Sequence, residues 1–227
     1  MSTTLLGAGG VFADTSQPTQ PDPADARTQI STVLTINEHP TAPEPPKNPD
    51  GGTDQETGIT GLFGIAYTPK ALSGTAQLQD SGRTEVPLSN NTATNDQNKY
   101  NVGVQDKTRG KDRNWTLKAQ LEWTGDEKGY MTGSTIEASE GNVKLNNGSG
   151  ALTPVTEEEV TIGNQATNLS ISNVPVTLMQ AHPDKVVNGV YNYQFKDPKL
   201  VIPKSEGVTA DTYSGNIVWN LSNALGE

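Results

Sequence analysis

Apolar and polar residues alternate along two nine-residue stretches of the chain, and this alternation predicts β-strands. In residues 115–123, WTLKAQLEW, every odd-numbered side chain is apolar and every even-numbered side chain is polar. Residues 213–221, YSGNIVWNL, place large apolar residues on one side in the same way: Tyr213, Ile217, Trp219 and Leu221. Because successive side chains on a strand point to opposite faces, each stretch has one face for a core and one for solvent.

Shorter apolar stretches bounded by turn signals predict further strands. They cover residues 62–67, 99–104, 160–162, 169–171, 174–179, 190–195 and 200–202. No long segment has the 3.6-residue period of a helix, so we expect helix only as single turns near Ser139 or residues 157–159. Many short strands separated by polar turns predict an all-β fold, an antiparallel β-sandwich or barrel-like single domain.

The first 58 residues differ in composition from the rest. Residues 1–13 contain an apolar stretch followed by Val11-Phe12-Ala13, a pattern typical of the end of a secretory signal. The alternative interpretation is an apolar N-terminus without a targeting role. Residues 14–58 hold eight of the 15 prolines, which predicts a disordered, flexible Pro/Thr-rich linker. Within it, residues 32–36 (TVLTI) alternate like an edge strand. We therefore expect the β domain over residues 59–227.

Composition narrows the classes of function. The net charge is -10, and an acidic chain lacks the basic face that dominates nucleic-acid affinity, so we expect no nucleic-acid partner. The absence of Cys excludes disulfides and thiolate metal sites. The only two His, His39 and His182, lie far apart in the sequence, and we predict no metal and no cofactor. No stretch approaches the about 20 apolar residues of a transmembrane helix.

Two Trp-x-Leu tripeptides, Trp115-Thr116-Leu117 and Trp219-Asn220-Leu221, carry a resemblance to a known family. The second completes the pattern Tyr213-x-x-x-Ile217-x-Trp219-x-Leu221, and residues 100–110, YNVGVQDKTRG, precede the first. In this context the chain resembles the WxL domain of Gram-positive bacteria from about residue 58 to 225. The resemblance implies a secreted protein of the cell surface that attaches to the cell wall without a covalent link. It implies peptidoglycan or another wall polymer as ligand, and a surface complex that includes a membrane-anchored protein encoded nearby.

Two interpretations stay open for the motif residues. Large aromatic residues on an alternating face are typical of a core, and the wall polymer would then bind adjacent loops such as residues 106–114. Alternatively, at least one Trp ring is exposed and touches the saccharide. The candidate residues in both cases are Trp115, Thr116, Leu117, Tyr213, Ile217, Trp219, Asn220 and Leu221. Because one sandwich has one main core, the two motifs should lie close together, on neighbouring strands.

Charged clusters supply weaker candidates. The densest basic patch consists of Lys107, Arg109, Lys111 and Arg113. It is a candidate contact for anionic wall polymers through charge-assisted hydrogen bonds, and the alternative interpretation is a solvated turn. The acidic runs 126–127 and 157–159 contain the carboxylates that glycoside hydrolysis requires, but adjacent glutamates are typical of a solvated face.

We therefore predict a wall-binding surface module that is not an enzyme. One alternative is an adhesin or scaffold component whose main ligand is a partner surface protein or host matrix. For that function, an edge strand at residues 32–36 would suit strand addition. A secreted carbohydrate-active enzyme is the other alternative.

Overall fold

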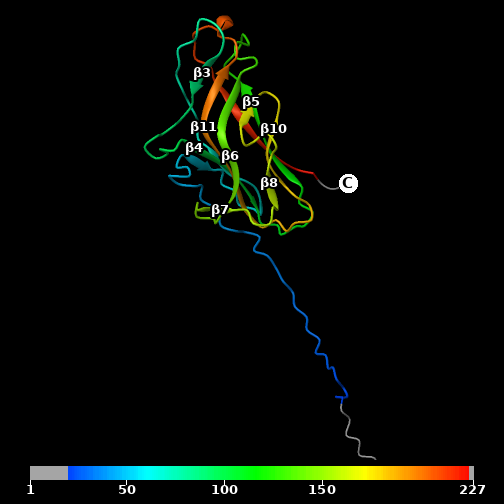
Figure 1. Ribbon diagram of the computed structural model, residues 1–227. Helices are drawn as coiled ribbons and strands as arrows, with labels where there is room; N and C mark the ends of the chain where they lie inside the picture. The colour runs from blue at the N-terminus through cyan, green and yellow to red at the C-terminus, as the bar shows by residue number, and fades with distance from the viewer. Residues whose placement is uncertain (1–19, 225–227) are drawn as a thin grey trace, which may run out of the picture. The chain divides into compact units, whose positions relative to one another are not determined.

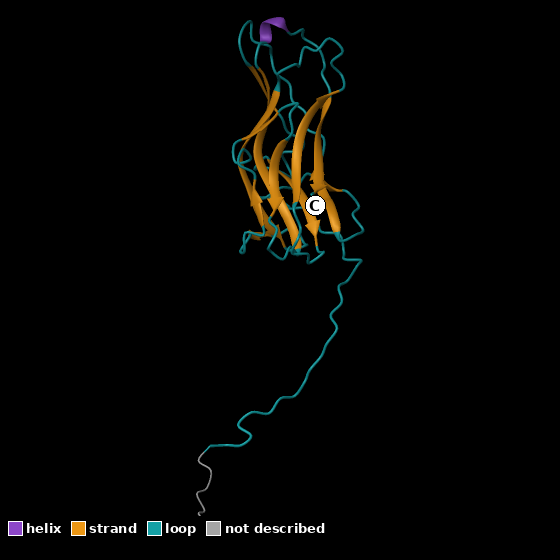
Figure 2. Cartoon of the chain, turned by 90° about the vertical axis from the view of Figure 1, so that its right-hand side faces the viewer, coloured by secondary structure: helices purple, strands orange, loops and turns teal. Residues whose placement is uncertain are grey.

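The computed structural model describes residues 20–224, and its regular structure there is almost entirely β (Figure 1). A single 3-10 turn, η1 (Ser205–Gly207), lies at one end of the domain (Figure 2). No helix in this part of the chain has the length and apolar character needed to cross a membrane. The strands are β1 (Asp54–Glu56), β2 (Phe63–Pro69), β3 (Thr84–Pro87), β4 (Lys99–Asp106), β5 (Trp115–Trp123), β6 (Thr135–Asn146), β7 (Leu152–Pro154), β8 (Val160–Ile162), β9 (Leu169–Ile171), β10 (Val176–Ala181), β11 (Gly189–Ile202) and β12 (Gly215–Asn223).

The strands form two antiparallel sheets, which confirms the predicted fold class. The larger sheet has the order β1-β2-β4-β11-β6-β7, with β3 also paired to β11 and β9 also paired to β6. The smaller sheet has the order β12-β5-β10-β8. Strands β5 and β12 are paired along their whole lengths, from Trp115 opposite Asn223 to Trp123 opposite Gly215. The end of the chain is thereby tied to its middle.

The core lies where the inner faces of the two sheets meet. Trp115, Leu117 and Ala119 of β5 are fully buried there, together with Tyr193 and Phe195 of β11. The strict alternation of β5 explains this placement, because its odd-numbered side chains all point to the inner face. One continuous cluster contains these residues, as expected for a single core.

In the long strands β6 and β11, a bulge changes whether the odd-numbered or the even-numbered side chains face the core. In β6, the register against β11 shifts near Ser139, and the next residue, Glu140, has a φ of 53°. In β11, the shift surrounds Asp197, which has a φ of 50°. An extra residue reverses the faces of the side chains beyond it. The predicted strands 190–195 and 200–202 are therefore two parts of β11, and Ser139 lies in a strand rather than in a helical turn. Residues 157–159 form no helical turn either.

The N-terminal region is divided differently from the sequence prediction. The chain separates into two compact units between Thr35 and Ile36. Residues 30–37 form no strand, so the predicted edge strand at residues 32–36 is absent from the structure. Residues 36–58, predicted as linker, belong to the second unit and include β1, which pairs with β2. The predicted signal remnant, residues 1–13, lies outside the described residues and stays a prediction.

Candidate functional site

Trp115, the first motif tryptophan, is part of the core. Its side chain is fully buried at the start of β5. The indole Nε1 donates a hydrogen bond of 2.9 Å to Asp106 Oδ2, and the ring packs between Phe63 and Tyr191, with centroids 6.3 and 6.1 Å away. Because no part of the ring reaches the surface, Trp115 supports the fold and leaves ligand contact to other residues.

Asp106 joins the parts of the chain around this tryptophan. One carboxylate oxygen accepts hydrogen bonds from the backbone N–H (3.0 Å) and hydroxyl (2.6 Å) of Thr108. The other accepts from Trp115 and from Arg113 Nε at 3.0 Å. The Arg113 guanidinium also lies 4.3 Å from the centroid of the Phe63 ring. Arg113, a predicted polyanion contact, is therefore engaged inside the domain. The sequence analysis included Asp106 as the first residue of the candidate binding loop 106–114 and in the family-like stretch 100–110, but did not predict its contacts with Trp115 and Arg113.

Trp219, the second motif tryptophan, is half-buried on β12. Its ring lies 6.2 Å, centroid to centroid, from that of Phe195 in the core. Tyr213 precedes the strand, donates a hydrogen bond of 2.8 Å to the Thr209 carbonyl, and meets Tyr130 edge to face at 6.4 Å. The second motif therefore covers the border of the core rather than its centre.

The two motifs lie on adjacent strands, as the sequence predicts. Leu221 stands directly opposite Leu117, and both point to the core, where Ile217 also packs. The central residues of the motifs, Thr116 and Asn220, are even-numbered, whereas the side chains that point to the core are odd-numbered. They therefore point to the outer face of the small sheet, where Thr116 is half-buried and Asn220 is exposed.

The outer face of the small sheet, here called the polar face, is almost free of apolar side chains. The register aligns its residues in rows across the strands, such as Gln180, Thr116 and Ser222, then Thr177, Lys118 and Asn220. Neighbouring strands lie about 4.8 Å apart, so these rows form a regular array of hydroxyl, amide and amino groups. Its members are Thr161, Thr177, Gln180, Thr116, Lys118, Gln120, Glu122, Asn216, Val218, Asn220 and Ser222.

Two shallow hollows adjoin the polar face. One is lined by Gln180 and Thr177 with the loop at residues 163–165. The other is lined by Gln120 and Glu122 together with Trp123, whose Nε1 donates a hydrogen bond of 3.0 Å to Ser134 Oγ. Trp123 has the inward-facing parity of β5 and packs against the core, so this hollow lies at the border between the polar face and the core.

The acidic runs take up structural positions. Asp126 accepts hydrogen bonds from the backbone N–H groups of Tyr130 and Met131, both at 2.8 Å, and so holds the turn after β5. Glu159 is buried and accepts a hydrogen bond from the Tyr191 hydroxyl at 3.3 Å. Both carboxylates thus organise local structure.

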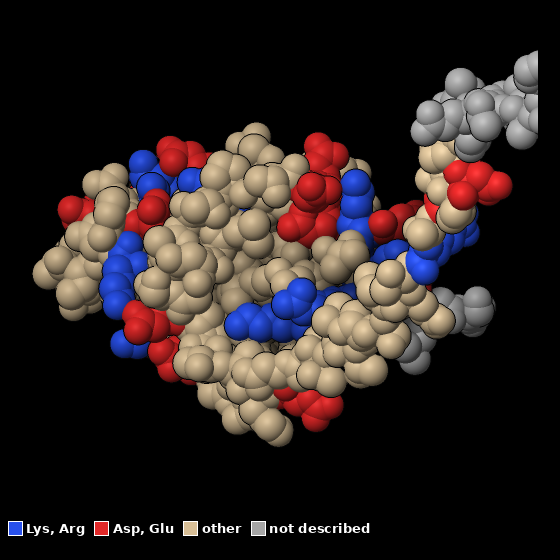
Figure 3. Space-filling view, turned by 90° about the horizontal axis from the view of Figure 1, so that it is seen from below, with Lys and Arg blue, Asp and Glu red and all other residues tan. Residues whose placement is uncertain are grey.

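The remaining predicted basic contacts lie on the loop between β4 and β5. Arg109 and Lys111 are exposed, and Lys107 is half-buried. Backbone hydrogen bonds fix the loop, from Arg109 N–H to the Val187 carbonyl and from Asp184 N–H to the Lys111 carbonyl. In the view from below, Lys and Arg side chains form a band across the centre, with acidic side chains around it (Figure 3). Basic groups can thus gather locally on an acidic chain.

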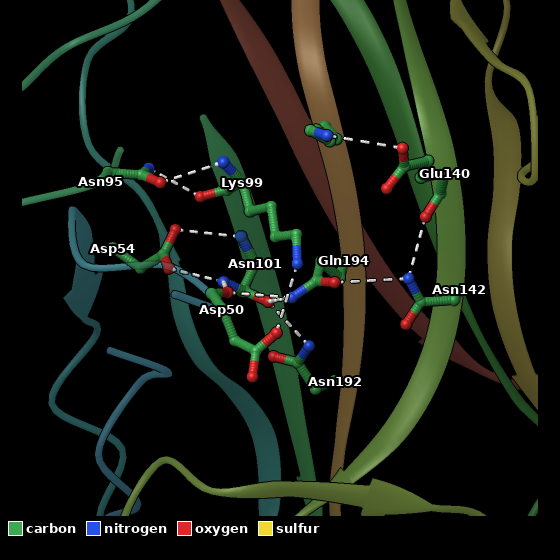
Figure 4. A network of polar contacts seen from close by, with 10 residues as sticks. Asp50, Asp54, Asn95, Lys99, Asn101, Glu140, Asn142, Asn192 and Gln194 are labelled. Carbon is green, nitrogen blue, oxygen red and sulfur yellow. Dashed lines mark hydrogen bonds and ion pairs between the residues drawn. The ribbon is translucent and has the colours of Figure 1, made fainter. Parts of the chain in front are cut away.

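The outer face of the large sheet is also polar, but the chain itself covers part of it (Figure 4). Asn101 and Gln194 donate hydrogen bonds of 2.8 and 2.9 Å to the Asp50 carbonyl. Both Asp54 oxygens accept hydrogen bonds from Asn101, and burial raises the pKa of Asp54 to about 7. Asn192 extends this group, because its Nδ2 donates a hydrogen bond to Asn101 Oδ1 and its Oδ1 accepts one from the Tyr67 hydroxyl. These amides bind the segment before β1, so the small sheet has the more accessible polar face.

Comparison with known proteins identifies a family through the sequence rather than through a solved structure. No curated protein matches the chain. A solved structure titled "Complete structure of manganese lipoxygenase of Gaeumannomyces graminis and partial structure of zonadhesin of Komagataella pastoris" is 10% identical. The alignment covers 82% of this chain and 79% of the other at a TM-score of 0.19, which is too low to indicate a shared fold.

The family model described as "WxL domain surface cell wall-binding" matches residues 13–224, nearly the whole chain. The match spans both Trp-x-Leu strands and the region before β1 that the sequence analysis assigned to a linker. The chain therefore belongs to the WxL domain family of surface cell wall-binding proteins.

Proposed function

We propose that this secreted domain attaches non-covalently to peptidoglycan through the polar face of the small sheet. The observation that carries the proposal is the orientation of the motifs. Both tryptophans point to the core side of the sheet, while Thr116 and Asn220 point to the polar face. The motif strands thereby support the fold with one face and offer hydrogen-bonding groups with the other.

The chemistry of the polar face suits a glycan with peptide branches. Sugar hydroxyl and N-acetyl groups require both donors and acceptors, which Gln120, Asn220 and the neighbouring hydroxyls supply. Lys118 lies between Thr177 and Asn220 in its row and can pair with a peptide carboxylate. The hollow lined by Gln120, Glu122 and Asn173 adds further polar groups at the border of this face.

Sedimentation with purified insoluble peptidoglycan tests this proposal. The variant Lys118→Ala/Gln120→Ala/Asn220→Ala should keep the wild-type melting temperature, because all three side chains lie outside the core. Loss of several hydrogen bonds of about 1 kcal/mol each should weaken binding by at least about tenfold. The matched control is Lys144→Ala/Thr153→Ala/Ser170→Ala, on strands of the large sheet. Equal sedimentation of both variants and the wild type would show that the polar face does not bind peptidoglycan.

The basic loop supports a second candidate contact, with anionic wall polymers. Arg109 and Lys111 are exposed on a loop with a hydrogen-bonded backbone, so their charges are presented to solvent from a fixed position. Arg109→Ala/Lys111→Ala should weaken sedimentation with whole walls but not with walls from which phosphate polymers have been extracted. An equal effect on both preparations would rule out a specific contact with these polymers.

The surface complex stays a further part of the proposed function. Its proposed partner is a membrane-anchored protein encoded nearby, which the resemblance of the two Trp-x-Leu motifs suggests. Co-purification from cell-surface extracts, with and without wall digestion, distinguishes a protein partner from attachment through the wall alone.

A further inference from the structure

Exposed apolar side chains are concentrated in one short segment of the described chain. Among residues 20–224, the large hydrophobic residues with exposed side chains include Ile30 at 90%, Val33 at 89% and Leu34 at 88%. Ile36, at 41%, extends the same segment, whereas Val174 and Val186 are the exposed ones elsewhere. Soluble proteins rarely leave such a cluster uncovered without a binding role.

The sequence of this segment is that of a strand. Residues 28–37, TQISTVLTIN, contain no charge, no Pro and no Gly. In an extended conformation, Ile30, Leu34 and Ile36 fall on one face and Val33 on the other. Such uncharged, β-prone stretches pair readily with a free strand edge.

Strand β12 offers such an edge. It pairs with β5 on one side, and within the part of the chain that the structure describes no strand pairs with its other side. Natural edge strands are usually protected by charges, Pro or bulges. The nine residues of β12, GNIVWNLSN, contain neither charge nor Pro, and their register with β5 is regular throughout. The inward-facing Ile217, Trp219 and Leu221 are only partly buried.

We propose that residues 30–36 of one copy add as a fifth strand to β12 of a second copy of this chain. The backbone groups of the added strand would pair with the open edge of β12. The side chains of Ile30, Leu34 and Ile36 would cover the partly exposed row of Ile217, Trp219 and Leu221. Both surfaces are uncharged, so the contact places no like charges opposite each other.

A second copy is the occupant that the chain itself supplies, because donor and acceptor are both present in every molecule. The donor segment and the acceptor edge are different surfaces, so the contact is heterologous. A heterologous contact links copies head to tail, and the average mass should rise with concentration. The added strand would extend the polar face beyond Asn216, Asn220 and Ser222 of β12, but the assembly itself requires no wall polymer.

The absence of native Cys allows a direct test on the full chain. Two single-cysteine proteins, Ser31→Cys and Ser222→Cys, whose side chains would both lie on the outer face of the extended sheet, are mixed and oxidised, and the mixed disulfide dimer is measured by non-reducing electrophoresis. We expect this dimer at several times the yield obtained when Val174→Cys replaces Ser222→Cys as the exposed control. The unmodified chain should show a concentration-dependent mass in sedimentation velocity, and Leu34→Lys, an exposed position outside the core, should remain monomeric.

Three results would overturn the proposal. One is a mixed dimer no more abundant than with the Val174→Cys control. Another is a double-cysteine chain, Ser31→Cys/Ser222→Cys, that forms its disulfide only within one molecule, which would place the segment on its own β12. The third is a chain that stays monomeric at all concentrations, which would leave the segment for a different protein.

Discussion

Asp106 shows how a single carboxylate can organise a motif that consists mainly of apolar residues. It is buried, and it accepts hydrogen bonds from Thr108, Arg113 and the indole of Trp115. Asp106→Ala would leave the Arg113 charge and the Trp115 N–H without their partner. We expect the free energy of unfolding to fall by about 3–5 kcal/mol, measured by urea denaturation. The exposed neighbour Asp112 is the control, and an equal effect of Asp112→Ala would contradict the structural role of Asp106.

Asp54 should make the stability of the domain depend on pH. Burial raises its pKa from 3.8 to about 7 in the folded protein, against the opposing effect of its hydrogen bonds with Asn101. The folded state therefore binds the proton more tightly, and stability falls as the pH rises from about 4 to about 7 and is constant above. Asp54→Asn should lose this part of the pH dependence. The exposed Asp80→Asn should retain it, and identical slopes for wild type and Asp54→Asn would contradict the prediction. Denaturant titrations at several pH values measure the slopes.

The sequence predicts the burial of single residues well where strict alternation extends over a whole strand. Trp115 and Leu117 are examples, because β5 contains no bulge. The same reasoning assigns Asn101 and Asn192 to solvent, since they alternate with apolar residues on β4 and β11. In the structure both are fully buried under the segment that includes Asp50. Their burial depends on the position of an irregular segment that is distant in the sequence, and the periodicity of a strand does not predict that position.

At the scale of the elements, the two motif strands should contribute unequally to stability. Trp115→Ala removes a fully buried ring and should cost about 3–5 kcal/mol. Trp219 lies half-buried on the edge strand, so Trp219→Ala should cost less, about 2 kcal/mol. Thermal unfolding of both variants checks the order. A larger loss for Trp219→Ala would mean that the pairing of β12 with β5 depends on that ring more than its burial indicates.

Strands were predicted where the two-residue period is intact and missed where it is interrupted. Strand β6 is 12 residues long but was not predicted, because the bulge near Glu140 moves its apolar residues from even to odd positions. Strands β1, β3 and β7, with the sequences DQE, TEVP and LTP, have at most one large apolar residue each, whereas the similarly short β8 and β9, VTI and LSI, have an apolar residue at both ends and were predicted. The partition into two sheets depends on long-range pairs such as β4 with β11, which no local pattern specifies.

At the scale of the whole molecule, the boundary of the folded domain can be located with trypsin. Arg27 lies in the first unit and is exposed, with no regular structure around it. Lys47 follows the buried Pro46, and nearby backbone groups are held by hydrogen bonds, such as that from Glu44 N–H to the Gly148 carbonyl. Cleavage requires local unfolding of the backbone, so the bond after Arg27 should be cut well before the bond after Lys47.

Mass spectrometry of the early fragments measures this order, with urea-unfolded protein as the control in which both bonds are cut at similar rates. A flexible linker over residues 14–58, as the composition predicts, would instead give equal rates in the native protein. The prediction from composition differs from the structure because a Pro-rich composition indicates only that a segment can bury little apolar surface. It does not report hydrogen bonds to a neighbouring sheet, and Asn101, Asn146 and Gln194 bind this segment through its backbone carbonyls. Early cleavage after Lys47 would show that these bonds do not hold the segment in solution.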